Sequence, residues 1–399
     1  MKRRSFLKLP LLAGGAFAIN RPAYACPERM RGTGDLGIII EIIERASGSV
    51  LVVDTTARKT LGRVEGLGDL SHASAVFSRD ERFAYVFGRD GGLTKVDILE
   101  MAIAARKVQA GNSIGGAISD DGRSIAVSNY EPGGVKVFDA DSLEEVENIP
   151  ASWGDGRLSK TVGLVDAPGS VFVFCLYDAG EIWTADFSGG GSPKVTRYAG
   201  IGALPYDGIL IDGRCYMAGL FGEDGLTFLD LWGDPPRPQK ILRQQGAPRD
   251  RLPVYKMPHL GGCAVASGRI LLPAAGQHEL IVLDAASFQE VARVPMAGQP
   301  VFAVVRPGGR QVWVNFALPN NDTVQVLDIP SLRIVHEFKP GPAVLHMEFV
   351  SKGAEAWVSV RDADRVDIYN AANFSKLAEI SAQKPSGVFF TARAHRLGA

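Results

Sequence analysis

Short apolar runs alternate with polar turns along most of the chain. The clearest unit extends from Asp69 to Asp97: two runs rich in Val, Phe, Tyr and Ala flank the polar turn at 79–82, and a third run follows the Gly-rich turn at 88–92. Runs of this length, bounded by turn residues, predict three consecutive β-strands. The third run ends in an apolar residue followed by Asp, and this closing pair recurs along the chain.

The closing pair marks eight units, which end at Val53-Asp54, Val96-Asp97, Phe138-Asp139, Ala185-Asp186, Leu229-Asp230, Leu283-Asp284, Leu327-Asp328 and, with Asn in place of Asp, Tyr369-Asn370. Successive pairs are 42 to 54 residues apart. A period of roughly 40 to 50 residues, made of strands and turns, is typical of four-stranded propeller blades. The pattern therefore predicts an all-β fold, an eight-bladed β-propeller.

The strand count also predicts how the ring closes. The first unit supplies only three strands, Gly37–Glu44, Ser49–Asp54 and Thr60–Val64, before the second unit begins. One apolar run, Ser386–Thr391, is left over at the other end of the chain. We expect this C-terminal strand to complete the first blade as its innermost strand, because an open sheet edge would otherwise remain in the ring.

The first 25 residues have the pattern of a twin-arginine signal peptide. Arg3-Arg4-Ser5-Phe6-Leu7-Lys8 is followed by the apolar stretch 9–19 and a small-x-small cleavage site at 23–25. This apolar stretch is too short to span a bilayer. We therefore expect export of the folded protein to the periplasm, with residues 26–399 forming a single propeller domain. A lipid anchor at Cys26 is the alternative, which Ala23 and Tyr24 disfavour because they make a poor lipobox.

Composition excludes some partners. The net charge is −1, with 43 Lys and Arg against 44 Asp and Glu, so no charge excess favours nucleic acid or an anionic membrane as partner. The chain contains no Cys-x-x-Cys-His motif, so no covalently attached haem c is expected. Cys175, Cys215 and Cys263 lie in strand-like runs and are interpreted as buried thiols.

Propeller topology predicts which turns meet. In each blade, the residues before the innermost strand and the turn between the second and third strands lie on the same face of the ring. Functional side chains gather at these positions: His72, Tyr206, His259, His346 and Lys384 before innermost strands, and Arg89, Tyr130 and Arg361 in the turns. Such a face suits a large, flat, partly apolar ligand that bears carboxylates and a metal.

Each of these residues also has a purely structural interpretation. A histidine at the start of a strand is often only a hydrogen-bonded structural group, Arg89 can pair with Asp90, and Tyr130 and Tyr206 can pack at the rim. The functional interpretation rests on recurrence, since His72, His259 and His346 stand near the start of an innermost strand in three different blades.

Two segments carry a resemblance to a known family. Ser71–Ser78 followed by Tyr85–Gly92 resembles the blade that carries the iron-ligating histidine and a carboxylate-binding arginine in the eight-bladed d1-haem domain of cytochrome cd1 nitrite reductases. The tail, Lys384–His395, is similar to relatives that lack the cytochrome c domain and act in haem d1 biosynthesis. The resemblance extends from about Gly37 to the tail.

The resemblance implies roles for individual residues. His72 would be the axial ligand of haem iron, and Arg89 would bind ring carboxylates. Tyr206 takes the place of a distal histidine, which argues against nitrite reduction, while His259 and His346 could restore a proton donor. The residues expected to bind the cofactor are His72, Arg89, Arg361, Lys384 and His346, and Tyr206 and His259 are the candidates for catalysis.

The expected ligand is haem d1 or dihydro-haem d1, held without a covalent bond. The expected function is a late step of haem d1 biosynthesis for nitrite reductase, an oxidation of the macrocycle that needs an external electron acceptor. Expected partners are cytochrome cd1 nitrite reductase and other haem d1 maturation proteins. One alternative is a non-catalytic carrier that hands over the tetrapyrrole, and another is a propeller used only for protein contacts.

Overall fold

The computed structural model describes residues 36–41, 48–223, 225–242 and 262–398. The chain divides into two units, Met1–Gly32 and Thr33–Ala399, and the fold below is that of the second. The expected signal peptide at 1–25, Cys26 and His259 lie outside the described residues, so the expectations placed on them stay predictions. No helix among the described residues is long and apolar enough to cross a membrane.

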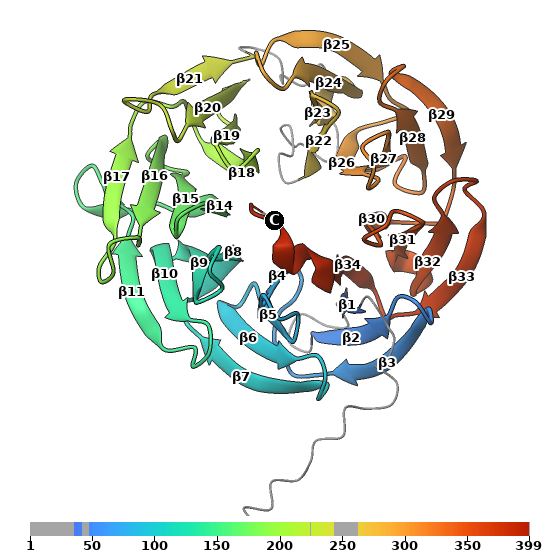
Figure 1. Cartoon of the computed structure of the whole chain (residues 1–399), viewed down its shortest axis with the longest axis horizontal. Helices are drawn as coiled ribbons and strands as arrows, with labels where there is room; N and C mark the ends of the chain where they lie inside the picture. Colours follow the sequence, from blue (N-terminus) through green and yellow to red (C-terminus); the bar gives the residue numbers. More distant parts are fainter. Residues whose placement is uncertain (1–35, 42–47, 224, 243–261, 399) are drawn as a thin grey trace, which may run out of the picture. The chain divides into compact units, whose positions relative to one another are not determined.

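Eight four-stranded antiparallel sheets form the blades of a ring (Figure 1). From the inside outward, blade 1 contains β34 (Pro385–Phe390), β1 (Leu36–Glu41), β2 (Ser49–Asp54) and β3 (Lys59–Val64). Blade 2 contains β4 (Ser74–Phe77), β5 (Phe83–Phe87), β6 (Gly92–Asp97) and β7 (Ala102–Val108). Blade 3 contains β8 (Asn112–Ile118), β9 (Ser124–Glu131), β10 (Gly133–Asp139) and β11 (Glu145–Pro150). Blade 4 contains β14 (Thr161–Ala167), β15 (Val171–Leu176), β16 (Glu181–Asp186) and β17 (Lys194–Tyr198).

The other four blades repeat this arrangement. Blade 5 contains β18 (Pro205–Ile211), β19 (Cys215–Leu220), β20 (Leu226–Asp230) and β21 (Pro238–Ile241). Blade 6 contains β22 (Ala264–Ala266), β23 (Arg269–Ala274), β24 (Glu279–Asp284) and β25 (Glu290–Pro295). Blade 7 contains β26 (Pro300–Val305), β27 (Gln311–Phe316), β28 (Val324–Asp328) and β29 (Arg333–Phe338). Blade 8 contains β30 (Val344–Phe349), β31 (Glu355–Val360), β32 (Arg365–Asn370) and β33 (Lys376–Ser381).

Ring closure occurs as the strand count predicts. The C-terminal strand β34 pairs antiparallel with β1, with Gly37 opposite Phe390 and Ile39 opposite Val388. The eight-bladed fold is therefore confirmed, and the last strand of the chain is the innermost strand of blade 1. A small hairpin, β12 (Ser152–Trp153) with β13 (Arg157–Leu158), joins blades 3 and 4 and was not predicted.

The closing Asp of each third strand has a local structural cause. The Oδ1 atom of Asp139 accepts the backbone N–H of Ser142 at 2.8 Å, and Asp284 accepts that of Ser287 at 2.8 Å. Asn370 accepts the N–H of Ala372 at 2.8 Å in the same way. These side chains cap the turn to the outermost strand, which explains why the pair recurs once per blade.

The core lies between neighbouring blades. Leu51 of blade 1 and Trp357 of blade 8 belong to one buried cluster, which also contains Phe390 of the closing strand. Middle strands such as β2 are buried along their whole length because both sheet faces pack on neighbours, whereas the outermost strand β7 is half exposed. Each blade therefore depends on the next for its core, and the ring depends on its closure.

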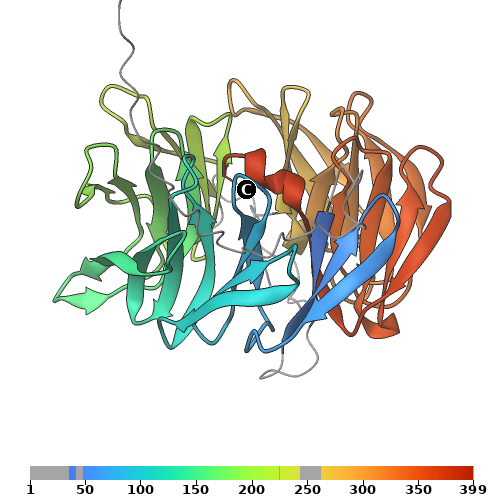
Figure 2. The ribbon, with the colours of Figure 1, turned by 60° about the horizontal axis from the view of Figure 1, so that its bottom comes forward.

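The C-terminal tail crosses the centre of the ring after β34 (Figures 1 and 2). It forms the short 3₁₀-helix η5 (Thr391–His395), and Arg79 donates a hydrogen bond to the Ala394 carbonyl. His395 Nε2 is 2.8 Å from Glu81 Oε1, and the Gly398 N–H donates to Asp166 at 2.9 Å. Arg79 and Glu81 lie in the turn between the first two strands of blade 2, so the tail docks on that face of the ring.

Removing residues 385–399 is expected to open the ring, because Val388, Phe389 and Phe390 are each less than 10% exposed. Burial of each side chain contributes roughly 1.5–3 kcal/mol, which for three is a large part of a typical 5–15 kcal/mol stability. Thermal unfolding followed by circular dichroism measures this loss. Removal of only 396–399, which leaves β34 intact, is the control, and an equal unfolding temperature for both truncations would contradict the closure argument.

The stability of the fold should also depend on Asp166. Burial raises the pKa of this carboxyl to about 6, while the N–H of Gly398 and the charge of Arg79 act in the opposite direction. A carboxyl with a raised pKa adds stability that is present below pH 4 and lost as the pH rises through 6. The shift from 3.8 corresponds to about 3 kcal/mol. The free energy of unfolding of the wild type minus that of Asp166→Asn should therefore fall between pH 4 and 7, and a constant difference would exclude this role of Asp166.

Candidate functional site

One face of the ring brings together the segments that sequence topology predicts to meet. We define the mouth face as the residues before the innermost strands together with the turns between second and third strands. In blade 2, the Arg89 N–H donates to the Asp69 carbonyl at 2.7 Å, and in blade 4 the Tyr177 N–H donates to the Lys160 carbonyl at 2.9 Å. In these two blades the turn is thus bonded to the start of its own innermost strand.

Arg89 is held in place by its backbone, while its charge has no carboxylate partner among the described residues. Asp90, its neighbour, forms an ion pair with Arg106 at 2.7 Å instead. Gly68 has φ +85°, and any Cβ there would collide with the carboxylate of Asp90, so only glycine leaves room for this pair. The structural alternative of an Arg89–Asp90 pair is therefore wrong, and the Arg89 guanidinium lies 5.9 Å from the Tyr130 ring centre.

A buried polar network fixes Tyr130. Its neighbour Asn129 exchanges two amide hydrogen bonds with Gln109, at 2.8 and 3.1 Å, and the Asn129 N–H donates to Thr161 Oγ1 at 2.9 Å. These side chains are at most 8% exposed. Since buried amides with both partners satisfied hold one geometry, the network positions Tyr130 at the end of β9.

Tyr130 and Tyr206 join blades 3 and 5 across the mouth face. Burial, and then the neighbouring Tyr206 phenol, raise the pKa of Tyr130, against an opposing effect of Arg89. Tyr206 also contacts Tyr177 edge-on at 6.3 Å and Phe221 at 6.0 Å between ring centres. We call Arg89, Tyr130, Tyr177, Tyr206 and Phe221 the mouth cluster; it unites one cation from blade 2 with four aromatic rings from blades 3, 4 and 5.

β-bulges explain how Tyr206 leaves the regular ladder. The pairing of β18 with β19 shifts between Pro205 and Gly208, and similar shifts occur near the mouth end of the innermost strand in blades 3, 4, 7 and 8. A bulge places two residues opposite one and re-aims a side chain. Sequence reasoning missed these bulges, and with them the packing of Tyr177 and Phe221 around Tyr206.

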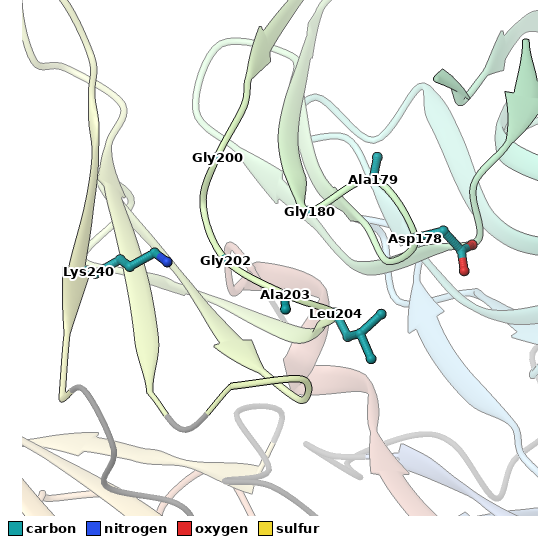
Figure 3. Close-up of a pocket in the computed structure, with 8 residues that line it drawn as sticks. All are labelled: Asp178, Ala179, Gly180, Gly200, Gly202, Ala203, Leu204 and Lys240. Atoms are coloured by element: carbon teal, nitrogen blue, oxygen red, sulfur yellow. The ribbon is translucent and has the colours of Figure 1, made fainter. Parts of the chain in front are cut away.

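A cavity of about 340 Å³ lies beside the mouth cluster between blades 4 and 5 (Figure 3). Its charged side chains already have partners: Asp178 is 3.6 Å from Lys160 Nζ, and Lys240 is 2.9 Å from Glu223. The remaining lining is uncharged and consists of Ala179, Ala203, Leu204 and the glycines Gly180, Gly200 and Gly202. Its charges are therefore balanced within the protein, unlike that of Arg89.

His72 lies in an exposed turn two residues before β4. The same segment contains Asp69, whose carbonyl accepts the Arg89 N–H, so His72 and Arg89 lie at the same end of blade 2 as expected. Among the described residues no group of three or more His, Cys, Asp or Glu side chains is placed to hold a metal ion. A haem iron, which needs one protein ligand, is the metal that a single histidine suits.

His346 does not share the position of His72. Phe77 and Phe349 are the last residues of β4 and β30. His72 precedes Phe77 by five residues, and the residue that precedes Phe349 by five is Val344. His346 therefore lies two residues deeper in its strand than the position that corresponds to His72. Its Nδ1 accepts the Val388 N–H at 3.2 Å, and burial, together with the charge of Arg393, lowers its pKa to about 3. The expectation that His346 shares the position of His72 is therefore wrong, and His346 is a neutral group within the ring wall.

Arg361 and Lys384 form a separate pair of cations on the mouth face, between blade 8 and blade 1. Arg361 begins the 3₁₀-helix η4 (Arg361–Ala363) and forms an ion pair with Asp362 at 2.8 Å. Lys384 Nζ is 3.7 Å from Asp364. Both cations are half exposed and already meet a carboxylate, so the structure groups them with each other and not with the mouth cluster.

Cys175, Cys215 and Cys263 form no disulfide; Cys175 is buried as expected, whereas Cys215 and Cys263 are only partly buried, so the expectation of buried thiols is wrong for these two. Cys175 is buried and lies 3.2 Å from the Tyr216 hydroxyl, in the core between blades 4 and 5. Another 3₁₀-helix, η3 (Ala275–Gln277), forms the corresponding turn of blade 6. None of these features adds a group to the mouth cluster.

Comparison with known proteins gives consistent results. Residues 31–394 match the family described as "Cytochrome D1 heme domain". The chain is 55% identical to Protein NirF of Pseudomonas aeruginosa over 92% of this chain and 94% of that protein, and 51% identical to Protein NirF of Stutzerimonas stutzeri over 94% and 96%. Its fold is similar to that of the dihydro-heme d1 dehydrogenase NirN in complex with DHE, with a TM-score of 0.78 and 24% identity over 91% of this chain and 76% of that one.

The expected resemblance is thereby confirmed at the level of the whole described ring. The match begins before β1 and ends within η5, so every blade and the closing strand belong to the matched region. The chain belongs to the cytochrome D1 heme domain family.

Proposed function

We propose that this protein binds haem d1 or a late precursor, such as dihydro-haem d1, on its mouth face and acts in a late step of haem d1 biosynthesis. Family membership supports a d1-type tetrapyrrole as the ligand, and so does the name of the similar dihydro-heme d1 dehydrogenase. The observation that carries the proposal is the mouth cluster, in which Arg89 lacks a carboxylate partner among the described residues and lies over the Tyr130 ring, beside the packed rings of Tyr177, Tyr206 and Phe221.

A tetrapyrrole fits these residues chemically. Its flat faces pack on aromatic rings, and its carboxylates pair with guanidinium groups, whose planar fork matches a carboxylate. Arg89 would bind one carboxylate, and the aromatic wall of Tyr177, Tyr206 and Phe221 would hold the macrocycle edge. Arg361 and Lys384 would meet further carboxylates after exchanging their present partners Asp362 and Asp364.

His72 would ligate the iron. It lies exposed at the same end of blade 2 as Arg89, so one ligand can meet both side chains. A neutral imidazole nitrogen is a common axial ligand of haem iron. The bond would hold the tetrapyrrole without covalent attachment of its ring, in agreement with the absence of a Cys-x-x-Cys-His motif.

The reaction we propose is a dehydrogenation at the macrocycle edge. Such a step removes two electrons and two protons from the substrate and leaves a new carbon–carbon double bond. An external acceptor would take the electrons, and Tyr206 with His259 would handle the protons. With a tyrosine in the distal position, the protein is not proposed to reduce nitrite.

A carrier is the second candidate, favoured by the state of Tyr130. Because burial raises its pKa, the phenol stays neutral at physiological pH. Neutral phenols hold a ligand by hydrogen bonds rather than by accepting its protons. In this candidate, the protein holds the tetrapyrrole and transfers it to cytochrome cd1 nitrite reductase or to another maturation protein.

We further propose that the protein works in the periplasm. The Arg3-Arg4 motif, the short apolar stretch and the cleavage site at 23–25 support export of the folded chain by the twin-arginine route. Lipidation at Cys26 is the alternative form of the mature protein. Mass spectrometry of the protein purified from the periplasm separates the two forms.

Titration of the purified protein with haem d1 should give a shifted, saturating ultraviolet–visible spectrum. His72→Ala should alter that spectrum and weaken binding by about tenfold or more, because the iron loses its protein ligand. His395→Ala is the matched control, since His395 is 59% exposed and docks beside Glu81 on the other face. No spectral change with folded wild-type protein would overturn the proposal in favour of a protein-interaction propeller.

A single-turnover assay with dihydro-haem d1 and an electron acceptor separates enzyme from carrier. If Tyr206 handles a proton, Tyr206→Phe should slow conversion by roughly 100-fold or more while binding persists. Tyr198→Phe, on the outermost strand β17, is the control and should convert at the wild-type rate. Tight binding by the wild type with no conversion by any acceptor would support the carrier instead.

A further inference from the structure

A second cavity of about 200 Å³ lies inside the ring, away from the mouth cluster. The innermost strands β22, β26 and β30 form its wall, and the tail that crosses the ring contributes Arg393 and Arg396. His346, Glu348 and Phe302 also line it. It is large enough for a small organic ion and brings together charges that none of the steps above uses.

The positive and negative charges in this cavity do not cancel. Glu348 is only 4% exposed and lies between two guanidinium groups, 3.3 Å from Arg393 Nε and 3.7 Å from Arg396 Nη1. One carboxylate therefore faces two cations. An excess of one positive charge in a partly enclosed space favours the uptake of one negative charge.

The Arg393 guanidinium also has unused donors. Its Nε is buried and forms no hydrogen bond with any other residue that the structure describes, although it lies close to Glu348. No hydrogen bond joins the rest of this guanidinium to another described residue; its remaining contact is with the Phe389 ring at 5.0 Å. A guanidinium carries five N–H donors in a fixed fork, and leaving them unpaired when buried costs free energy.

His346 adds a further donor. Because its Nδ1 accepts the Val388 N–H, the hydrogen of the neutral imidazole must lie on Nε2. The ring is fixed between Phe389, stacked at 5.2 Å, and Phe302, edge-on at 5.6 Å. The cavity thus combines an excess cation, unused guanidinium donors and a rigid imidazole N–H donor in its wall.

We propose that this cavity binds a carboxylate, held by Arg393 and Arg396 and balanced against Glu348. A carboxylate matches the guanidinium fork in shape and charge, and a single one neutralises the excess. It can belong to a free small acid or to a side chain of a larger ligand held in the ring. The site needs only residues of this chain and does not depend on the tetrapyrrole proposal.

Calorimetric titration of the full-length mature protein with formate at constant ionic strength tests the site. Arg393→Gln should weaken formate binding by about tenfold or more, because it removes the excess charge. Glu348→Gln should strengthen binding by a similar factor, because it removes the competing carboxylate. A cluster with only a structural role would give no heat with formate in any variant, and that result would overturn the proposal.

Two controls keep the result interpretable. Arg310→Gln removes an exposed ion pair with Asp328 on blade 7 and should leave formate binding unchanged. If Arg393→Gln does not fold, Arg396→Gln replaces it, since Arg396 is 49% exposed. Equal affinity in wild type, Arg393→Gln and Arg396→Gln would mean that formate binds elsewhere, and would also overturn the proposal.

The source of the carboxylate follows from a second titration, of protein saturated with haem d1. Unchanged formate affinity identifies the ligand as a free small acid. Loss of formate binding shows that a carboxylate of the tetrapyrrole occupies the cavity. Either outcome supports the site, and failure of haem d1 to bind leaves the formate result standing by itself.

Discussion

Pairing of β34 with β1 is the constraint on which the rest of the structure depends. It joins the two ends of the chain within one sheet, and the cores between blades can then continue around the ring without a gap. The buried cluster that unites Leu51, Trp357 and Phe390 exists only because this pair forms. Closure also sends the tail across the ring, where it docks by Glu81 and Asp166 and builds the inner cavity.

The closed ring brings turns from different blades together on one face, where they form the candidate site. The site draws its residues from four different blades, and these residues lie far apart in the sequence: Arg89, Tyr130, Tyr177 and Tyr206. The ring brings them together because the same topological position of each blade faces one side. Two local features then shape the site. Asp90 pairs with Arg106 and so leaves Arg89 without its neighbouring carboxylate as a partner, and the β-bulge at Tyr206 brings the Tyr206 ring against its neighbours.

The sequence predicts the parts of the fold whose causes are local. Each third strand ends in Asp or, in blade 8, in Asn because that side chain caps the next turn. The blades could therefore be counted from the sequence, and the leftover strand predicted closure. Contacts between distant residues could not be found in this way. The register between strands determines the partner of Asp90, the bulge at Tyr206 and the depth of His346 in its strand. The path of the tail determines the ion pairs of Glu348.

We propose that one tetrapyrrole lies on the mouth face between His72 and the mouth cluster. A crystal structure of the protein with bound haem d1 would show its position. We expect iron ligated by His72, a ring carboxylate paired with Arg89, and the macrocycle edge against Tyr206. A tetrapyrrole bound on the other face, or iron ligated by another residue with Arg89 still uncontacted, would contradict this proposal.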